Sequence, residues 1–221
     1  MELLSAEHVG ALAVTGVAAG WAARTRSVAA ARGLAVVIGT TYVVEHLAFV
    51  VRGTWAVDFN LPLHLTDAVT IVSVLALWTG RPALVELTYF WALSASLQAV
   101  LTPDLGSEFP EIFYWTYFIT HSGAVVAAIL LVAGRRIVPP PGAVRRVFAI
   151  TLAFAAMAGL ADVITGGNYM FLREKPDSAT LLDVMGPWPW YIATGAVLGF
   201  VLFTLLDLPL RVIRRSALRE E

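Results

Sequence analysis

The chain has 221 residues, of which 58% are hydrophobic and 14% are charged, and its mean hydropathy of +0.76 excludes an ordinary soluble domain. The formal net charge is −1, and we expect an integral membrane protein with no nucleic-acid partner. Cysteine is absent, which excludes a disulfide, a thiolate nucleophile and a cysteine-bound metal.

Seven apolar runs follow one another along the chain, each near the ~20 residues that cross a bilayer as a helix. They occupy residues 6–23, 31–51, 62–79, 83–101, 112–133, 146–164 and 188–209. The longest polar interval, Thr165 to Pro187, is loop-sized. We therefore expect an all-α protein, with residues 1–221 forming one domain of seven transmembrane helices. Asn60 as N-cap and Pro62 in the first turn predict the start of the third helix.

The basic residues are distributed unevenly between the two sides of this predicted bundle. Of the 15 lysines and arginines, all except Arg52, Arg173 and Lys175 lie on the side where the chain ends. The positive-inside rule assigns the richer side to the cytoplasm. We expect a multi-pass protein of the cell membrane with its N-terminus outside and its C-terminus cytoplasmic, and we name the two sides the predicted outer and inner ends.

An ionisable side chain in hydrocarbon costs roughly 2.5–3.5 kcal/mol on insertion scales, so each one needs a partner, a wet cavity or a task. At about 1.5 Å per residue, these polar groups lie in the outer half of the bundle: Glu45, His46, His64, Thr66, Asp67, Gln98, His121 and Asp162. Their distribution predicts a cavity that opens toward the outer leaflet. Glu86 and Asp207 lie near inner helix ends, where pairing with arginines is expected. His8, near the outer terminus, is interpreted as a surface residue.

Helical spacing divides these groups into faces. On the third helix, His64 and Asp67 share one face, while Thr66 lies on a second face with the hydroxyls of later turns. On the fifth helix, Tyr117 and His121 share a face. An intramembrane threonine usually bonds back to its own helix, and this is the default interpretation of Thr66 taken alone.

Five segments, in their order and spacing, resemble the YwaF-like family of integral membrane proteins over residues 40–210. They are LPLHLTD (61–67), QAVLTPDL (98–105), THSG (120–123), GNYMFLREKP (167–176) and LLDVMGPWPWY (181–191). Eukaryotic relatives look like transmembrane acyltransferases that remodel phospholipid chains, with a helix-three cysteine and a later histidine implied as the catalytic pair. Carried over, the cysteine position is Thr66 and the histidine is His121. Because this chain lacks cysteine, a thiolate mechanism is excluded.

Threonine keeps a nucleophilic oxygen, and androgen-induced-gene type membrane hydrolases are a more distant comparison in which an intramembrane Thr and His are implied to cleave lipid esters. The resemblance thus implies lipid acyl transfer or ester hydrolysis, with Thr66 as nucleophile, His121 as base, and membrane lipids as partners and substrates. Gln98 or Tyr117 would donate to the oxyanion, and Asp67 or His64 would orient the base. We expect no cofactor or bound metal. The supporting cavity residues are His64, Asp67, Gln98, Tyr117, Asp104, His46, Glu45, Asp162, Asn168 and Tyr169.

Three other functions stay open. A metal-dependent membrane hydrolase has nitrogen and oxygen ligands available, although no histidine pair has i, i+4 spacing. A transporter is disfavoured because the predicted polar groups stop halfway through the membrane. A non-catalytic lipid-binding or scaffold protein needs no reactive pair at all. The outer loop, Thr165 to Pro187, is either an interfacial lid or a plain connection with aromatic anchors. The oligomeric state is not predicted.

Overall fold

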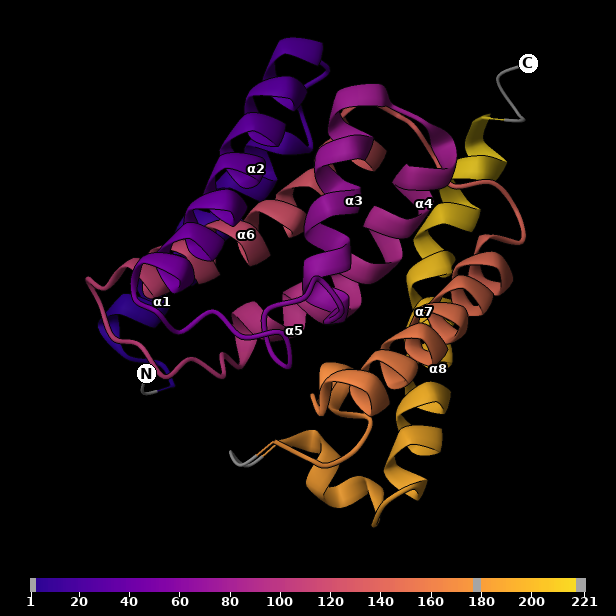
Figure 1. The fold of residues 1–221 in the computed structure, drawn as a ribbon. Coiled ribbons are helices and arrows are strands. Elements are labelled where there is room, and N and C mark those ends of the chain that lie inside the picture. The colour runs from indigo at the N-terminus through magenta and orange to yellow at the C-terminus, as the bar shows by residue number, and fades with distance from the viewer. Residues whose placement is uncertain (1–2, 177–179, 218–221) are drawn as a thin grey trace. The chain divides into compact units, whose positions relative to one another are not determined.

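The computed structural model describes residues 3–176 and 180–217, and all regular structure in these ranges is helical (Figure 1). The predicted all-α class is therefore confirmed. Two compact units divide the chain. Unit 1 holds the residues up to Thr54 together with Thr66–Pro140, and unit 2 holds Trp55–Leu65 together with the chain from Pro141 onward.

In the described part of the chain, five helical rods are long and apolar enough to cross a membrane. They are α2 (Val28–Val51), the continuous rod of α4, η1 and α5 (Pro82–Leu101), α6 with η2 (Ile112–Gly134), α7 (Ala143–Thr165) and α8 (Trp190–Ala217). The other two predicted spans are helical as well, as α1 (Ala6–Ala22) and α3 (Leu65–Thr79), but they contain 17 and 15 residues. At 1.5 Å per residue, α3 is about 23 Å long, which is less than the ~30 Å hydrocarbon core.

The start of α3 differs from its sequence prediction. Asn60 does not cap this helix, because its side-chain Oδ1 accepts the backbone N–H of Ala56 at 2.8 Å. Pro62 disfavours the helical conformation in the residue before it. The chain therefore closes a turn around Asn60, and α3 begins only at Leu65.

The central helix of unit 1 is α6, which packs against α1, α2 and the rod that contains η1. On the α1 side, the hydroxyls of Thr15 and Ser122 are hydrogen-bonded at 2.8 Å. On the α2 side, a Cβ at Gly123 would stand 2.7 Å from Cγ1 of Ile38. Glycine thus permits a close approach of the two helices. The helix α3 lies along α2 in turn.

Two rods of unit 1 each contain a π-helical segment. The segment η1 (Ala92–Ser96) follows α4 (Pro82–Trp91), and η2 (Leu130–Gly134) follows α6 (Ile112–Ile129). A π-helical turn inserts one extra residue and changes which side chains share a face. In the first rod, this change occurs where the rod packs against α6.

Unit 2 is built from α7, α8 and the connections at their ends. The two helices pack together, with the rings of Phe148 and Phe200 5.1 Å apart. Between them the chain forms two short 3₁₀ turns, η3 (Tyr169–Phe171) and η4 (Leu181–Met185). Tyr169 is completely buried, and its hydroxyl donates to the Val57 carbonyl at 2.7 Å and accepts the Leu61 N–H at 3.0 Å. This tyrosine thus links the segment before α3 to the connection between α7 and α8 by hydrogen bonds.

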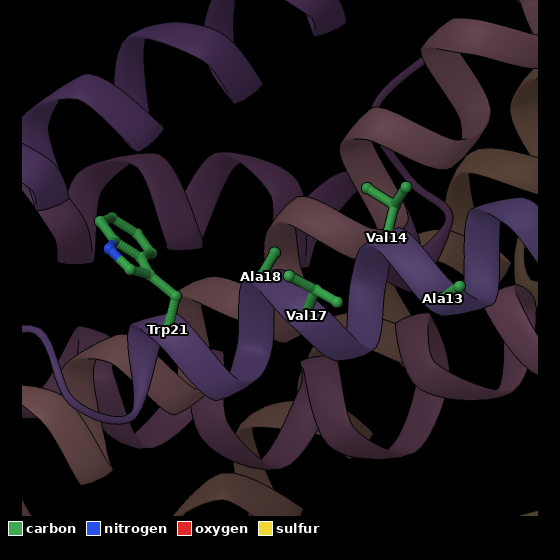
Figure 2. Close-up of a pocket in the computed structure, with 5 residues that line it drawn as sticks. All are labelled: Ala13, Val14, Val17, Ala18 and Trp21. Atoms are coloured by element: carbon green, nitrogen blue, oxygen red, sulfur yellow. The ribbon is translucent and has the colours of Figure 1, made fainter.

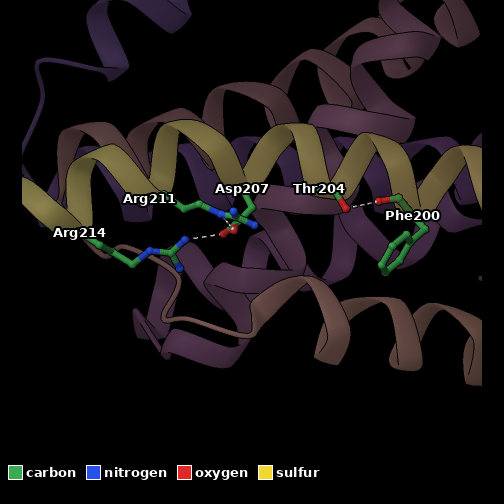
Figure 3. Close-up of polar contacts among 5 residues, drawn as sticks. All are labelled: Phe200, Thr204, Asp207, Arg211 and Arg214. Atoms are coloured by element: carbon green, nitrogen blue, oxygen red, sulfur yellow. Dashed lines mark hydrogen bonds and ion pairs between the residues drawn. The ribbon is translucent and has the colours of Figure 1, made fainter.

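Near its C-terminal end, α8 carries the ion pair that the sequence predicts. Asp207 is buried, and its two carboxylate oxygens accept from Arg211 Nε at 2.7 Å and from Arg214 (Figure 3). Thr204, on the same helix, donates to the Phe200 carbonyl at 2.9 Å. The expected pairing of Asp207 with arginines is thus confirmed.

Candidate functional site

The predicted nucleophile lies in the first turn of α3. Thr66 is the second residue of this helix and is half-buried. Other helical threonines donate to the carbonyl four residues earlier, as Thr15, Thr70 and Thr204 do at 2.7–2.9 Å. Within the described residues the Thr66 hydroxyl makes no such bond, because the residue four positions earlier, Pro62, lies outside the helix. Back-bonding of this hydroxyl to the carbonyl four residues earlier is therefore not seen in the described residues.

The predicted base lies on α6. The half-buried ring of His121 stacks on that of Tyr117, with centroids 4.2 Å apart and planes at 26°. Its Nδ1 lies 2.7 Å from the Tyr117 carbonyl oxygen. A carbonyl only accepts, so Nδ1 carries the proton and Nε2 keeps its lone pair. In the part of the chain that the structure describes, Nε2 has no partner, which leaves it available to accept a proton.

Thr66 and His121 belong to the same unit, but no hydrogen bond joins them among the described residues. The face of α6 that carries His121 is turned toward the rod of α4, η1 and α5, because the Tyr117 hydroxyl donates to the Ala99 carbonyl at 2.9 Å. The pairing of Thr66 with His121 stays a prediction.

A group of the predicted supporting residues gathers where α2, α3 and α6 meet. The Tyr42 hydroxyl is buried beside the Asp67 carboxylate and near that of Glu45. Glu45 in turn lies near Thr116 and His46. The ring of His46 packs on Tyr42, four residues earlier, with centroids 4.5 Å apart. Tyr42 is not among the site residues predicted from the sequence, although its i, i+4 spacing to a membrane histidine was an available signal.

Two predicted cavity residues lie instead on the surface of unit 1. Gln98 is exposed on α5 (Leu97–Leu101), and Asp104 is exposed in the connection that follows. The π-helical segment Ala92–Ser96, just before Gln98, changes which side chains of this rod share a face. Contrary to the prediction, Gln98 does not point into the interior.

The remaining predicted residues form a group in unit 2, around Tyr169. Asp162 is completely buried near the end of α7, and its Oδ1 accepts the Tyr169 N–H at 2.6 Å. Its Oδ2 has no hydrogen-bond partner among the described residues. In the connection before α3, His64 accepts the Met170 N–H at Nδ1 (3.3 Å) and packs its ring 5.2 Å from that of Tyr169. Burial lowers the pKa of His64, and the charge of nearby Asp162 opposes this shift.

Asn168 organises the connection that follows α7. Its Oδ1 accepts the N–H of Arg173 at 3.0 Å, and its Nδ2 donates to the Glu174 carbonyl at 2.9 Å. Met170 and Phe171 both have φ of +55°, a left-handed conformation that costs about 1–2 kcal/mol per non-glycine residue. Such strain persists only where surrounding contacts impose it. The described part of this loop therefore has a defined conformation, which holds His64 and Tyr169 in place.

His8 is not the surface residue that its position suggested, because it is completely buried in unit 1. Its Nδ1 accepts the Leu4 N–H at 3.0 Å, and its Nε2 lies 2.9 Å from the Val100 carbonyl. Val100 is in the last turn of α5, where carbonyls have no partner within the helix. His8 therefore caps α5 with both ring nitrogens engaged, and we assign it a structural role.

Three hydroxyls of unit 1 are buried with no hydrogen-bond partner among the described residues: those of Ser73, Thr88 and Ser96. A serine in a helix can bond to the carbonyl four residues earlier, as Ser94 does to Phe90 at 2.7 Å. Leaving a buried hydroxyl unpaired costs about 1–3 kcal/mol. These groups are functional candidates, and none of them is among the site residues predicted from the sequence.

The structure gives little support to two other kinds of site. Among the described residues, no three His, Asp or Glu side chains are grouped so that they could hold a metal ion. A shallow groove of about 520 Å³ lies on the exposed face of α1 (Figure 2). It is lined by Ala13, Val14, Val17, Ala18 and Trp21. This apolar lining offers no reactive group.

The comparisons with known proteins agree with this architecture. The TMEM164 family model matches residues 3–207, a range that includes Thr66, His121 and all seven predicted spans up to Asp207. No curated protein and no solved structure gives a significant match. The matched range is nearly the whole chain, and its apolar helices place the protein in a membrane. The chain belongs to the TMEM164 family of transmembrane proteins.

Proposed function

We propose that this membrane protein acts on lipid esters of the cell membrane, transferring their acyl chains to an acceptor or hydrolysing them. The observation that carries the proposal is the geometry of His121, whose Nδ1 is engaged by the Tyr117 carbonyl while Nε2 keeps a lone pair without a partner in the described residues. A histidine held in this tautomer is a ready general base. The five segments that resemble those of YwaF-like proteins, whose relatives look like phospholipid acyltransferases, add support.

Thr66 is the proposed nucleophile. Its hydroxyl is not bonded to its own helix, and its place in the first turn of α3 lets the helix dipole favour a developing negative charge. As Thr66 Oγ1 attacks the ester carbonyl carbon, Nε2 of His121 takes its proton. The ester C–O bond then breaks, and the lysolipid oxygen leaves with that proton, giving an acyl-threonine. Water or an acceptor hydroxyl removes the acyl group by the same steps in reverse.

This mechanism requires Nε2 to reach the Thr66 proton directly or through one water, a contact that often tightens when substrate binds. The test uses protein reconstituted in vesicles of phospholipid with isotopically labelled acyl chains. We expect Thr66→Ala and His121→Ala each to lower acyl release or exchange on the order of 10³-fold or more, with the double variant no worse, because the two residues act as a unit. Thr66→Cys, which restores the residue of the relatives, should keep activity.

Thr79→Val is the matched control. Thr79 lies at the other end of α3, is exposed, and donates to the Leu75 carbonyl at 2.6 Å. We expect its replacement to leave turnover unchanged. Normal turnover in either Thr66→Ala or His121→Ala would contradict the proposed pair.

Transport is the second candidate, because buried polar groups extend further inward than the sequence predicts. The unpaired hydroxyls of Ser73 and Thr88 each lie six residues from the α3–α4 turn, about 9 Å along the helix. The same vesicles distinguish the two functions: solute flux that survives Thr66→Ala, without any ester turnover in the unmodified protein, would favour transport.

A further inference from the structure

The proposed mechanism needs a hydrogen-bond donor for the carbonyl oxygen, which becomes negatively charged when the ester is attacked. From the sequence, we expect Gln98 or Tyr117 to donate this hydrogen bond. Gln98 is exposed, and the Tyr117 hydroxyl already donates to the Ala99 carbonyl at 2.9 Å. Neither side chain is therefore placed to serve the oxyanion, and another donor is required.

Ser96 has the properties of such a donor. It is the last residue of η1, only 1% of it is exposed, and its hydroxyl has no hydrogen-bond partner among the described residues. The carbonyl four residues earlier, that of Ala92, accepts instead the N–H of Leu97 in the π-helical pattern. The hydroxyl is thus not used by its own helix and lies in the packed interior of unit 1.

The register of the two rods brings Ser96 to the level of His121. The rods are antiparallel, because α4, where the first begins, packs against η2, where the second ends. The contact from Tyr117 to Ala99 sets their alignment. His121 follows Tyr117 by four residues, which is about 6 Å of helical rise. The same number of residues counted back from Ala99 leads to Ala95, next to Ser96, within the segment that packs on α6.

Two complementary groups without a partner in the described residues therefore lie at a similar level of the two packed rods: an O–H donor on η1 and a nitrogen lone pair on α6. We propose that Ser96 donates a hydrogen bond to the carbonyl oxygen of the ester that Thr66 attacks beside His121. This inference rests on the proposed function and names the residue that stabilises its transition state.

The Ser96 proton is not transferred in this step. The bond from Thr66 Oγ1 to the carbonyl carbon forms, the carbonyl oxygen takes the electron pair and accepts from Ser96, and the pair returns when the ester C–O bond breaks. For Ser96 to act in this way, the substrate must have a carbonyl oxygen at the end of its hydrocarbon chain. The substrate class is accordingly acyl esters or thioesters, and alkyl-ether chains are not cleaved.

Ser96→Ala in the vesicle assay tests the role, with Ser94→Ala as matched control. Ser94 belongs to the same π-helical segment, but its hydroxyl donates to the Phe90 carbonyl at 2.7 Å. We expect Ser96→Ala to lower kcat by about 10²–10³-fold, the usual effect of losing one oxyanion donor, with KM changed by less than about twofold. Ser94→Ala should keep kcat within about twofold. Because the Ser96 hydroxyl has no partner in the described residues of the unliganded protein, its removal should leave the melting temperature unchanged.

A second measurement separates binding from turnover. A fatty alkyl trifluoromethyl ketone adds reversibly to a nucleophilic hydroxyl and forms a tetrahedral oxyanion. It should stabilise the unmodified protein and Ser94→Ala against heat, and bind Ser96→Ala and Thr66→Ala at least tenfold more weakly. Turnover and ketone binding of Ser96→Ala at the unmodified level, with Thr66→Ala inactive, would overturn the role of Ser96 and leave the proposed function standing. An unmodified protein that neither turns over esters nor binds the ketone would overturn both.

Discussion

Buried polar side chains have different hydrogen-bond partners in the two units. In unit 2, side chains from the connections bond to backbone: Tyr169 uses its hydroxyl twice, and Asn168 closes the loop after α7. In unit 1, hydroxyls on the helices are buried without a hydrogen-bond partner among the described residues. They are those of Ser73, Thr88 and Ser96. Asp162 is the exception in unit 2, with one oxygen paired and one unpaired.

This difference arises because connections and helices differ in how many free backbone N–H and C=O groups they contain. A connection has free N–H and C=O groups, which buried side chains such as Tyr169 can satisfy. A helix interior has already used its backbone groups, so a polar side chain between helices depends on another side chain, a water or a ligand. Unpaired groups on the helices of unit 1 therefore indicate function more strongly than paired groups in the loops of unit 2. Three changes test this contrast in order of expected effect.

The largest effect tests whether close packing, rather than polar bonding, stabilises unit 1. A Cβ at Gly134 would stand 2.4 Å from the backbone carbonyl oxygens of Ala22 and Thr25. We expect Gly134→Ala to lower the free energy of unfolding by about 3 kcal/mol, because backbone cannot move aside as a side chain does. Unfolding in SDS, followed by circular dichroism, measures the change.

Gly16→Ala is the control, because a Cβ there meets nothing within 4 Å. We expect it to stabilise α1 by up to about 1 kcal/mol, since glycine disfavours a helix. Similar unfolding energies for Gly16→Ala and Gly134→Ala would mean that close packing does not hold unit 1 together.

The second effect tests whether bonds from side chains to backbone hold the connections of unit 2. Tyr169→Phe leaves the Val57 carbonyl and the Leu61 N–H without their partner. We expect a loss of about 2 kcal/mol, because unsatisfied buried backbone groups are costly. Tyr191→Phe, which removes one bond at 2.6 Å to the Phe171 carbonyl, should cost about half as much. If both variants lost a negligible free energy of unfolding, bonds from side chains to backbone would not distinguish unit 2 from unit 1.

The smallest effect concerns the unpaired hydroxyls themselves. Ser73→Ala and Thr88→Val remove groups that make no hydrogen bond in the described part of the chain. We expect unfolding energies that are unchanged or higher by up to about 1 kcal/mol, because a desolvated, unpaired group is lost. Thr70→Val is the comparison, since it removes a bond to the Thr66 carbonyl at 2.8 Å. A loss beyond about 1 kcal/mol in Ser73→Ala would show that this hydroxyl has a partner in the folded protein.

The helical content of this protein follows from the sequence because the length and hydrophobicity of a run are local properties. Each of the seven predicted runs contains a helix, and the run at 112–133 starts at the same residue as the α6 rod and ends one residue before it. The pairing of Asp207 with Arg211 is predictable for the same reason, since four residues on a helix bring the two side chains together.

The direction in which a side chain points was decided by tertiary structure. His8 is buried through a bond to Val100, 92 residues away in the chain. The π-helical segment, which packs on α6, separates exposed Gln98 from buried Ser96.

The start of α3 was decided in the same way. The Tyr169 hydroxyl holds Leu61, 108 residues earlier, in a connection where the sequence predicts a helix. Apolar length is a property of each segment alone, whereas the rotation and register of a helix depend on which neighbours it packs against. The sequence by itself therefore determined that the chain forms membrane helices, and tertiary packing decided which polar side chains are left without a hydrogen-bond partner among the described residues.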